Sequence, residues 1–587
     1  MEKAIAACRE AIRLKYGFAE THRNLGFALW RNGQLEEALA ALREAVRLKK
    51  NYAEAHYSLG VVLHSKGQLE EAIAAYREAI RIKKDYADAH NNLGHALRDN
   101  HEPEEAIAAC REAIRLKKDY AHAHDNLGNA LGDMGRLEEA IAAYREAIRL
   151  KKDYGGAHHN MGTALWASGR HEEAIAAFRE AIRLNKDDSD AHNNLGSALS
   201  YQGRLDEAVA AFRQAIRLKK DFAVAYLNLG VALRYKGQVD QAIAAYREAI
   251  RIKKDYAQAH HYLGRALRLT GQLEEAIAEF REAIRLNKDV AEVHYNLGLA
   301  LQVQGRLDEA IAAYREAIRI KKDYAEAHVH LGDALRDKGR LEESLAACRE
   351  AIRLKKDLAE AYCTLGLTLM FQADFRPALE ALRRGHELGS RNPRWNNPSA
   401  QWVQKCERLL ELDGRLPDFL AGKAKPAGAA ECVDLAEVCV FKHLDRAACR
   451  FYEEAFATEP KLAARHRSKA AGAAAQAGCG RANDADKVDD KERARLRRQA
   501  LDWLQADLEA WRHLLDNKSD NASAARVAGV LQRWLTDPTL VVVREPKQLA
   551  NLPEAERQPW REFWAQVAET LARARQAASL KKKSGVQ

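Results

Sequence analysis

The sequence predicts an all-α protein built as a tandem array of helical hairpins. Eleven glycines, from Gly26 to Gly366, follow one another at intervals of 34 residues without an insertion. Within one such unit, residues 53–86, apolar side chains recur at helical spacing in two successive stretches, which indicates two amphipathic helices per unit. Gly67 separates the stretches, and we expect it to end the first helix in a left-handed conformation. Only 11 of the 587 residues are proline, which agrees with a largely helical chain.

Each unit carries a fixed pattern of small, branched and aromatic residues. In residues 53–86 the pattern consists of His56, Leu59, Gly60, Leu63, Ala72, Tyr76 and Ala79. It resembles the tetratricopeptide repeat, and the resemblance extends over residues 19–392. The resemblance implies a right-handed superhelical solenoid whose first helices line a concave groove.

The repeat period also predicts how the chain is divided into regions. Residues 1–18 correspond to the second helix of a partial repeat, which suggests that the chain belongs to a longer protein, and residues 19–392 hold eleven complete repeats. Prolines and glycines interrupt the pattern at residues 393–430, which predicts a linker. A repeat-like, tryptophan-rich helical region is expected at residues 431–578, followed by a basic tail at residues 579–587.

The region beyond the linker is predicted to cap the array. Residues 444–462 again resemble the second helix of a tetratricopeptide unit, whereas the Ala/Gly-rich and Asp-rich residues 469–490 are expected to form a loop. Apolar residues at helical spacing predict helices over residues 491–516 and 553–577. Seven of the nine tryptophans lie beyond residue 390, which favours a hydrophobic helical cap at the end of the solenoid.

A second resemblance concerns the C-terminal third of the chain. Residues 400–575, above all the segments that begin at Ala470 and Asp489, resemble the tail of planctomycete-type bacterial proteins in which a serine/threonine kinase domain precedes tetratricopeptide repeats. The kinase motifs themselves do not occur in this sequence, and neither does a Walker loop, a Gly-x-Ser-x-Gly elbow or a His-Glu-x-x-His pair. We therefore expect a non-catalytic chain without a cofactor, which could serve as the arm of a signalling kinase.

Asparagine recurs at the sixth position of the repeats, directly before the Leu-Gly pair. The seven asparagines in this row are Asn24, Asn92, Asn126, Asn160, Asn194, Asn228 and Asn296. In the tetratricopeptide arm of the N-acetylglucosaminyl transferase that modifies serine and threonine, such asparagines clamp an extended peptide backbone. An amide offers both a donor and an acceptor to a peptide unit, so the row predicts a peptide-binding groove. The alternative is that duplication simply copied the asparagine along the array.

Neighbouring groove positions vary while the scaffold does not, as expected of a recognition surface or of relaxed exposed positions. Basic and aromatic residues gather at these positions, and we expect them to favour an acidic peptide or a C-terminal carboxylate. They are Arg98, Arg234, Tyr235, Arg265, Arg268 and Arg336.

The linkers between repeats depart from the family pattern. Lysine stands where the family has proline, for example at Lys50 and Lys84, so helix termination is predicted to depend on caps such as Asp85. Nine repeats carry histidine at the first aromatic position, and we interpret these histidines as core-edge residues. The nine cysteines include no CxxC pair and are expected to be free thiols. The sequence therefore predicts no metal site.

Charge and hydropathy limit the partners. The net charge is +10, and from residue 394 onward 33 Lys+Arg face 27 Asp+Glu, so the repeats themselves are close to neutral. Without a regular base-reading code, nucleic acid is an unfavoured partner. No apolar run is long enough to span a membrane, so we expect a cytoplasmic protein. The main prediction is a scaffold that binds a peptide or partner protein; the alternative is a structural element that self-associates through its open N-terminal end.

Overall fold

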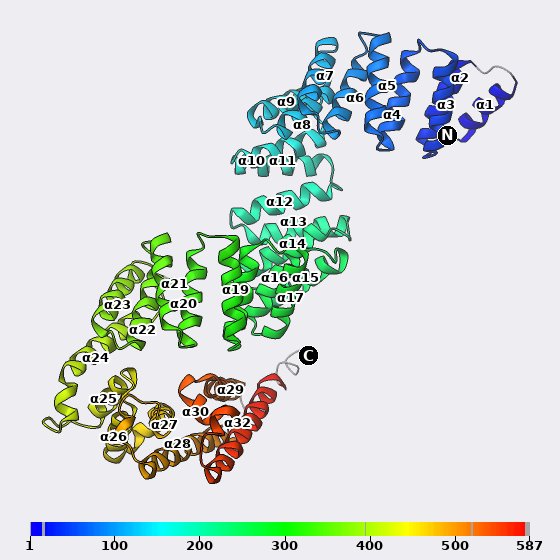
Figure 1. Ribbon diagram of the computed structural model, residues 1–587. Helices are drawn as coiled ribbons and strands as arrows, with labels where there is room; N and C mark the ends of the chain where they lie inside the picture. Colours follow the sequence, from blue (N-terminus) through cyan, green and yellow to red (C-terminus); the bar gives the residue numbers. More distant parts are fainter. Residues whose placement is uncertain (1, 15–17, 394, 518–520, 581–587) are drawn as a thin grey trace. The chain divides into compact units, whose positions relative to one another are not determined.

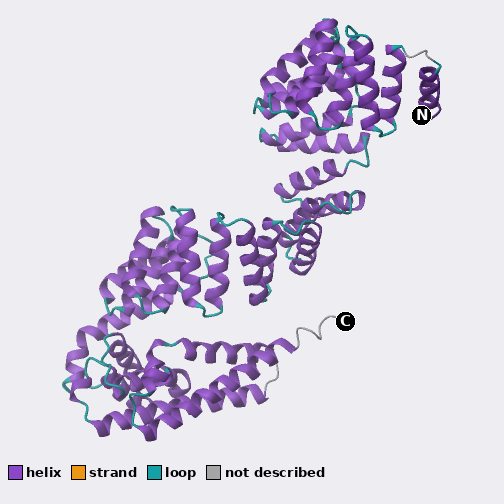
Figure 2. Ribbon diagram, turned by 45° about the vertical axis from the view of Figure 1, so that its right-hand side comes forward, coloured by secondary structure: helices purple, strands orange, loops and turns teal. Residues whose placement is uncertain are grey.

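The computed structural model describes residues 2–14, 18–393, 395–517 and 521–580, and these residues form helices joined by short loops, with no strand among them (Figures 1 and 2). The predicted all-α solenoid is therefore confirmed. The chain forms two compact units, Met1–Ala266 and Leu267–Gln587. Most of the predicted basic tail, from residue 581 onward, lies outside the described residues.

Each complete repeat is one hairpin of a 13-residue first helix and a second helix of 14 to 16 residues. The first helices are α2 (Ala19–Arg31), α4 (Ala53–Ser65), α6 (Ala87–Asp99), α8 (Ala121–Asp133), α10 (Gly155–Ala167), α12 (Ser189–Tyr201), α14 (Ala223–Tyr235), α16 (Ala257–Leu269), α18 (Ala291–Val303), α20 (Ala325–Asp337) and α22 (Ala359–Phe371). The second helices are α3 (Leu35–Leu48), α5 (Leu69–Ile82), α7 (Pro103–Leu116), α9 (Leu137–Leu150), α11 (His171–Leu184), α13 (Leu205–Leu218), α15 (Val239–Ile252), α17 (Leu273–Leu286), α19 (Leu307–Ile320), α21 (Leu341–Leu354) and α23 (Phe375–Ser390). Helix α1 (Glu2–Arg13) precedes them and packs on α2.

Close approach of the two helices explains the glycine period. A Cβ atom at Gly60 would lie 2.7 Å from the ring of Tyr76, which is 1% exposed, so only glycine lets the ring lie against the first helix. The loop glycine has a different role: Gly67 has φ +79°, the left-handed conformation predicted for the end of the helix.

The helix starts differ from the prediction. Asp85, Asp119, Asp153 and Asp221 do not cap the first helices, because the capping residues are the aromatics Tyr86, Tyr120, Tyr154 and Phe222, which form no side-chain capping bond. The linker is held by other contacts. The ammonium of Lys83 lies 4.9 Å from the ring centroid of Tyr86, and His56 donates from Nε2 to the Lys50 carbonyl at 3.0 Å. Where aspartate replaces the aromatic, Asp188 does cap, accepting from the Ala191 N–H at 2.8 Å.

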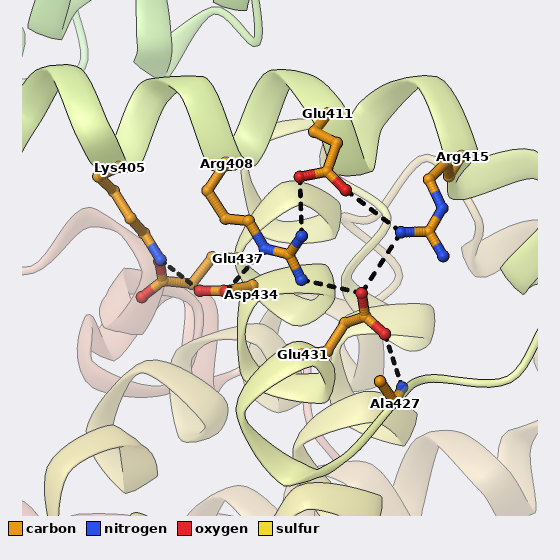
Figure 3. Close-up of polar contacts among 8 residues, drawn as sticks. All are labelled: Lys405, Arg408, Glu411, Arg415, Ala427, Glu431, Asp434 and Glu437. Carbon is orange, nitrogen blue, oxygen red and sulfur yellow. Dashed lines mark hydrogen bonds and ion pairs between the residues drawn. The ribbon is translucent and has the colours of Figure 1, made fainter.

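The segment predicted as a linker, residues 393–430, contains a long helix. Helix α24 (Ser399–Leu420) packs between α23 and α25 (Ala429–Phe441), and charged side chains join α24 to α25 (Figure 3). Lys405 pairs with Glu437 at 2.7 Å and Arg408 with Glu431 at 2.8 Å, and both glutamates are at least 90% buried. These buried carboxylates need their cationic partners, so α24 and α25 are fixed to each other rather than joined flexibly.

The C-terminal helices are α26 (Asp445–Thr458), α27 (Ala463–Gly478), α28 (Asp490–Asn517), α29 (Asn521–Thr536), α30 (Val541–Arg544), α31 (Pro546–Leu549) and α32 (Glu554–Leu580). The loop predicted over residues 469–490 is thus wrong for its first half, which lies in α27. Small residues allow close packing there: a Cβ atom at Gly478 would lie 2.7 Å from Cγ of Arg497 on α28. The alanine and glycine run is therefore a buried helix surface rather than a loop.

Tryptophans form much of the C-terminal core. Trp534, Trp560 and Trp564 are buried, and their hydrophobic cluster continues through α24–α28 to Leu382 of the last repeat. The described helices at positions 491–516 and 553–577 agree with the predicted ones. In the described part of the chain, no helix is both long enough and apolar enough to cross a bilayer.

Candidate functional site

The first helices line the inner side of each unit. Most second helices pack on the first helix of their own hairpin and on that of the next one, as α5 does on α4 and α6. Among the described residues, first helices of successive hairpins also touch one another, for example α4 with α6 and α20 with α22, more than second helices do. The inner surface is therefore the one on which residues from successive repeats meet.

The asparagine row lies on this inner surface, and most of its amides join neighbouring repeats. Five of the seven asparagines donate from Nδ2 to the side chain 35 residues earlier, over 2.9–3.1 Å. The pairs are Asn92 with Tyr57, Asn126 with Asn91, Asn160 with Asp125, Asn194 with His159 and Asn228 with Asn193. We call these five pairs the polar series.

The two remaining asparagines behave differently. Asn24 is exposed and accepts from Arg23 at 2.7 Å, whereas Asn296 is buried and donates to the Glu292 carbonyl of its own helix at 2.7 Å. The predicted row is thus one continuous structural feature only from Asn92 to Asn228.

The acceptors of the polar series occupy the fifth position of the repeats, which sequence reasoning missed. Asn91, Asp125 and Asn193 are buried although they are polar. The signal was present: this position is polar from Arg23 to Asn193 and then becomes Leu227. A buried polar position on an otherwise apolar helix face indicates a hydrogen-bond partner.

Asp125 is the buried carboxylate of the polar series. Its oxygens accept from Asn160 Nδ2 at 3.1 Å and from the Tyr154 hydroxyl at 3.1 Å. Burial raises the pKa of Asp125, and the hydrogen bonds from Asn160 and Tyr154 offset part of that rise.

Oxygen acceptors of the series remain available to a ligand. In the described residues, Oδ1 of Asn126, Asn160 and Asn228 receives no hydrogen bond, because each of these amides is engaged only through its nitrogen. The Oδ1 atoms of Asn92 and Asn194, in contrast, accept from Asn91 and Asn193. Three amide oxygens therefore remain to accept a hydrogen bond from a peptide N–H.

Two cavities open beside the polar series. The first has a volume of about 810 Å³, and its lining includes Arg98, Asp133, Tyr144 and Asn160. The second, of about 510 Å³, is lined by Asn228 together with Tyr201 and Tyr235, whose side chains are 68% and 65% exposed. Exposed tyrosines beside a cavity offer a surface on which apolar or aromatic side chains can pack.

The predicted basic residues divide into two groups. Arg336 pairs with Asp333 at 2.8 Å and with Asp337 at 2.9 Å, and Arg98 pairs with Asp99 at 2.9 Å, so their charges are already balanced. Arg234, Arg265 and Arg268 form no ion pair within the described residues. The guanidinium of Arg234 lies 4.5 Å from the Tyr235 ring centroid, and that of Arg265 lies 5.8 Å from the ring centroid of Tyr262. Arg268 is half-buried on the same helix as Arg265.

Family models together match residues 31–396 without a gap. Models described as TPR repeat match residues 31–67 and 62–100, and models described as tetratricopeptide repeat match residues 85–153 and 119–187. The chain is a tetratricopeptide-repeat protein. Residues 185–396 match the C-terminal domain of cilia and flagella-associated protein 70.

Several solved structures resemble parts of this tetratricopeptide-repeat (TPR) array. YrrB, described as a TPR protein with an unusual peptide-binding site, is 28% identical over 32% of this chain and 96% of its own, with a TM-score of 0.28. MamA is 26% identical over 28% of this chain and 97% of its own, with a TM-score of 0.27. One chain of the Cut9–Hcn1 heterotetramer of the APC/C matches 69% of this chain and 92% of its own at 14% identity and a TM-score of 0.37. No curated protein matches the sequence.

Proposed function

We propose that this tetratricopeptide-repeat scaffold binds an extended peptide along the inner face of residues 57–265. The observation that carries the proposal is the set of open amide oxygens on Asn126, Asn160 and Asn228, each held in place by its own bond to the preceding repeat. Such pre-oriented acceptors bind peptide N–H groups whatever the peptide side chains are, and they lose little rotamer freedom on binding.

Side-chain selection comes from the neighbouring residues. The cavity beside Tyr201 and Tyr235 suits an apolar or aromatic side chain. Arg234 and Arg265 carry charges that the described residues do not neutralise, and these favour a carboxylate or another anionic group. The ligand class is therefore an extended peptide that combines an apolar residue with an acidic one, which refines the acidic peptide predicted from the sequence.

A peptide-display library tests the proposal, with the affinities of selected peptides measured by fluorescence anisotropy. The variant N126A/N160A/N228A removes the three amide oxygens, and we expect it to bind selected peptides at least about tenfold more weakly. The matched control R111A/R145A/R179A changes three exposed arginines on the second helices α7, α9 and α11 and should bind as the parent does. Circular dichroism verifies that both variants remain folded. Failure to select any peptide, or equal binding by both variants, would overturn the proposal.

The assignment to a signalling kinase rests on the sequence resemblance of residues 400–575 alone. Within this proposal the groove recruits a partner or substrate to that kinase. Sequencing the gene upstream of the Met1 codon tests it: an in-frame kinase domain supports the assignment, and an in-frame stop codon followed directly by the start codon contradicts it.

A further inference from the structure

A cluster of three metal-ligating side chains lies on the inner surface between the second and third complete repeats. His64 comes from α4, and His95 and Asp99 come from adjacent turns of α6. One ligand atom of each lies within 4.8 Å of the others, the only such group among the described residues. The notable feature is the residue combination, since two imidazoles with one carboxylate is a donor set that Zn²⁺ and its neighbours in the first transition series favour.

Two of the three edges of the cluster match those of a tetrahedral site, and the third, between the two histidine nitrogens, is at most 4.8 Å. Metal–ligand bonds of about 2.0–2.1 Å place neighbouring ligand atoms roughly 3.3 Å apart in a tetrahedron. Asp99 Oδ2 lies 3.0 Å from His64 Nε2 and 3.5 Å from His95 Nε2. Both distances are therefore near the required edge length, and the one carboxylate oxygen faces both histidines.

The second oxygen of the carboxylate has a separate partner. Arg98 donates from Nη2 to Asp99 Oδ1 at 2.9 Å, so the carboxylate is held with Oδ2 turned toward the imidazoles. Outer partners of this kind orient metal ligands and tune their affinity. The positive charge of Arg98 offsets some of the attraction for a cation, so we expect moderate rather than extreme affinity.

The other repeats show what is special about this cluster. Residues 35 apart also meet at this place in the two neighbouring repeat pairs: Trp30 donates to Ser65 at 3.1 Å, and Arg98 Nε lies 3.8 Å from Asp133 Oδ2. In the next repeat pair the equivalents of His64, His95 and Asp99 are Arg98, Asn129 and Asp133. The carboxylate is retained there but both imidazoles are missing, so the three-ligand set belongs to one repeat pair alone.

We propose that His64, His95 and Asp99 bind one divalent transition-metal ion, of which Zn²⁺ is the probe of choice. The side chains of His64, Asp99 and His95 are 17%, 31% and 44% exposed, so the site is anchored in the scaffold and open on the groove side. Three protein ligands leave a fourth position for water or for a donor group of a bound partner. Asp99 also lines the cavity of about 810 Å³, which places that open position beside the groove.

Calorimetric titration of the metal-free full chain with ZnCl₂ tests the proposal, with Co²⁺ absorption spectra to report tetrahedral N/O coordination. We expect the parent to bind one equivalent more than the variants H64Q and H95Q, or to bind it at least about tenfold more tightly. The matched controls are D133N, which alters the equivalent carboxylate of the next repeat pair, and H122Q, which removes an exposed histidine of α8. Both should bind as the parent does.

Each outcome bears on the proposal. His95 is the most exposed ligand, so H95Q should keep the fold even if H64Q disturbs the repeat contact, and circular dichroism verifies this. Loss of one bound ion in H95Q, with unchanged D133N and H122Q, supports the site. Zinc binding that survives H64Q and H95Q, or an absence of Zn²⁺ and Co²⁺ binding by the parent, overturns it.

Discussion

The side-chain pairs on the inner face differ in chemistry between residues 57–228 and residues 295–364, although both regions are built from the same repeat. In the first region, side chains 35 residues apart form the polar series of amides, Asp125 and His159. In the second, the equivalent pairs are Tyr295 with His330, whose ring centroids lie 5.5 Å apart, and Val329 with Thr364, both buried. The glycine and alanine core fixes the hairpin in both regions, so the inner pairs are free to differ in chemistry without a change of fold.

The largest expected effect on stability comes from placing a carboxylate of the first region at the equivalent buried position of the second region. Val329 is the equivalent of Asp125, is 3% exposed and packs in a cluster with Ala325, Ala351 and Leu358. V329D places a carboxylate there without a designed partner, and we expect a loss of about 3–5 kcal/mol in the free energy of unfolding. Urea unfolding followed by circular dichroism measures it, with V329A as the control for lost volume. A loss no larger than that of V329A would show that the two regions are not distinct.

The reverse exchange, D125V, should lower the free energy of unfolding by less than V329D does. D125V removes a buried carboxylate but leaves the Asn160 amide and the Tyr154 hydroxyl without their acceptor. We expect a loss of about 1–3 kcal/mol in the free energy of unfolding, measured in the same way. D125N keeps an acceptor oxygen at this position and should lose less than D125V. If both substitutions were neutral, the polar series would contribute nothing to stability.

A single pair of the polar series should contribute a smaller amount. Asn126 donates to Asn91 at 2.9 Å, and replacing either by alanine should cost about 1 kcal/mol of unfolding free energy. A double-mutant cycle with N91A, N126A and N91A/N126A isolates their interaction. We expect a coupling of about 0.5–1.5 kcal/mol. Strict additivity would mean that these two amides do not join the repeats.

The smallest expected effect is a pH dependence of the stability that Asp125 contributes to the polar series. Because burial raises the pKa of Asp125 above its value in the unfolded chain, its favourable contribution is complete below about pH 4 and is lost as the pH rises through the folded pKa. D125N does not titrate, so its stability relative to the parent should increase from about pH 4 to pH 7. Unfolding curves at both pH values measure this. A difference that is constant or decreases with pH would contradict the assignment.

The sequence was sufficient to predict features that are determined by contacts or conformations within one repeat or one helix. Gly60 against Tyr76 and the left-handed Gly67 follow from the period, and the helices near residues 491–516 and 553–577 follow from apolar spacing. The sequence-based predictions were wrong for features that depend on how different helices and loops contact one another. Asp85 was expected to cap a helix, but the aromatic beside it is the capping residue. Helices α24 and α27 are stabilised by the helices packed on either side of them, α23 and α25 for α24 and α26 and α28 for α27.

The candidate site was predicted only in part for the same reason. The asparagine row is visible in the sequence, but the partner of Asn126 is Asn91 of the preceding repeat, and this pairing depends on how successive hairpins pack. His64 and His95 lie at different repeat positions, so neither repeat alone indicates their meeting with Asp99. The signal available for the acceptors was a fifth repeat position that is polar in six successive repeats, from Arg23 to Asn193.

We propose that the groove binds the backbone of an extended peptide first and its side chains second. A scan of single N-methyl substitutions along one library-selected peptide tests this directly, because the protein itself is left unchanged. We expect methylation of the N–H groups opposite Asn126, Asn160 and Asn228 to weaken binding at least about tenfold, more than alanine substitution of most peptide side chains. Tolerance of every N-methyl group, with affinity lost only on side-chain substitution, would contradict the claim.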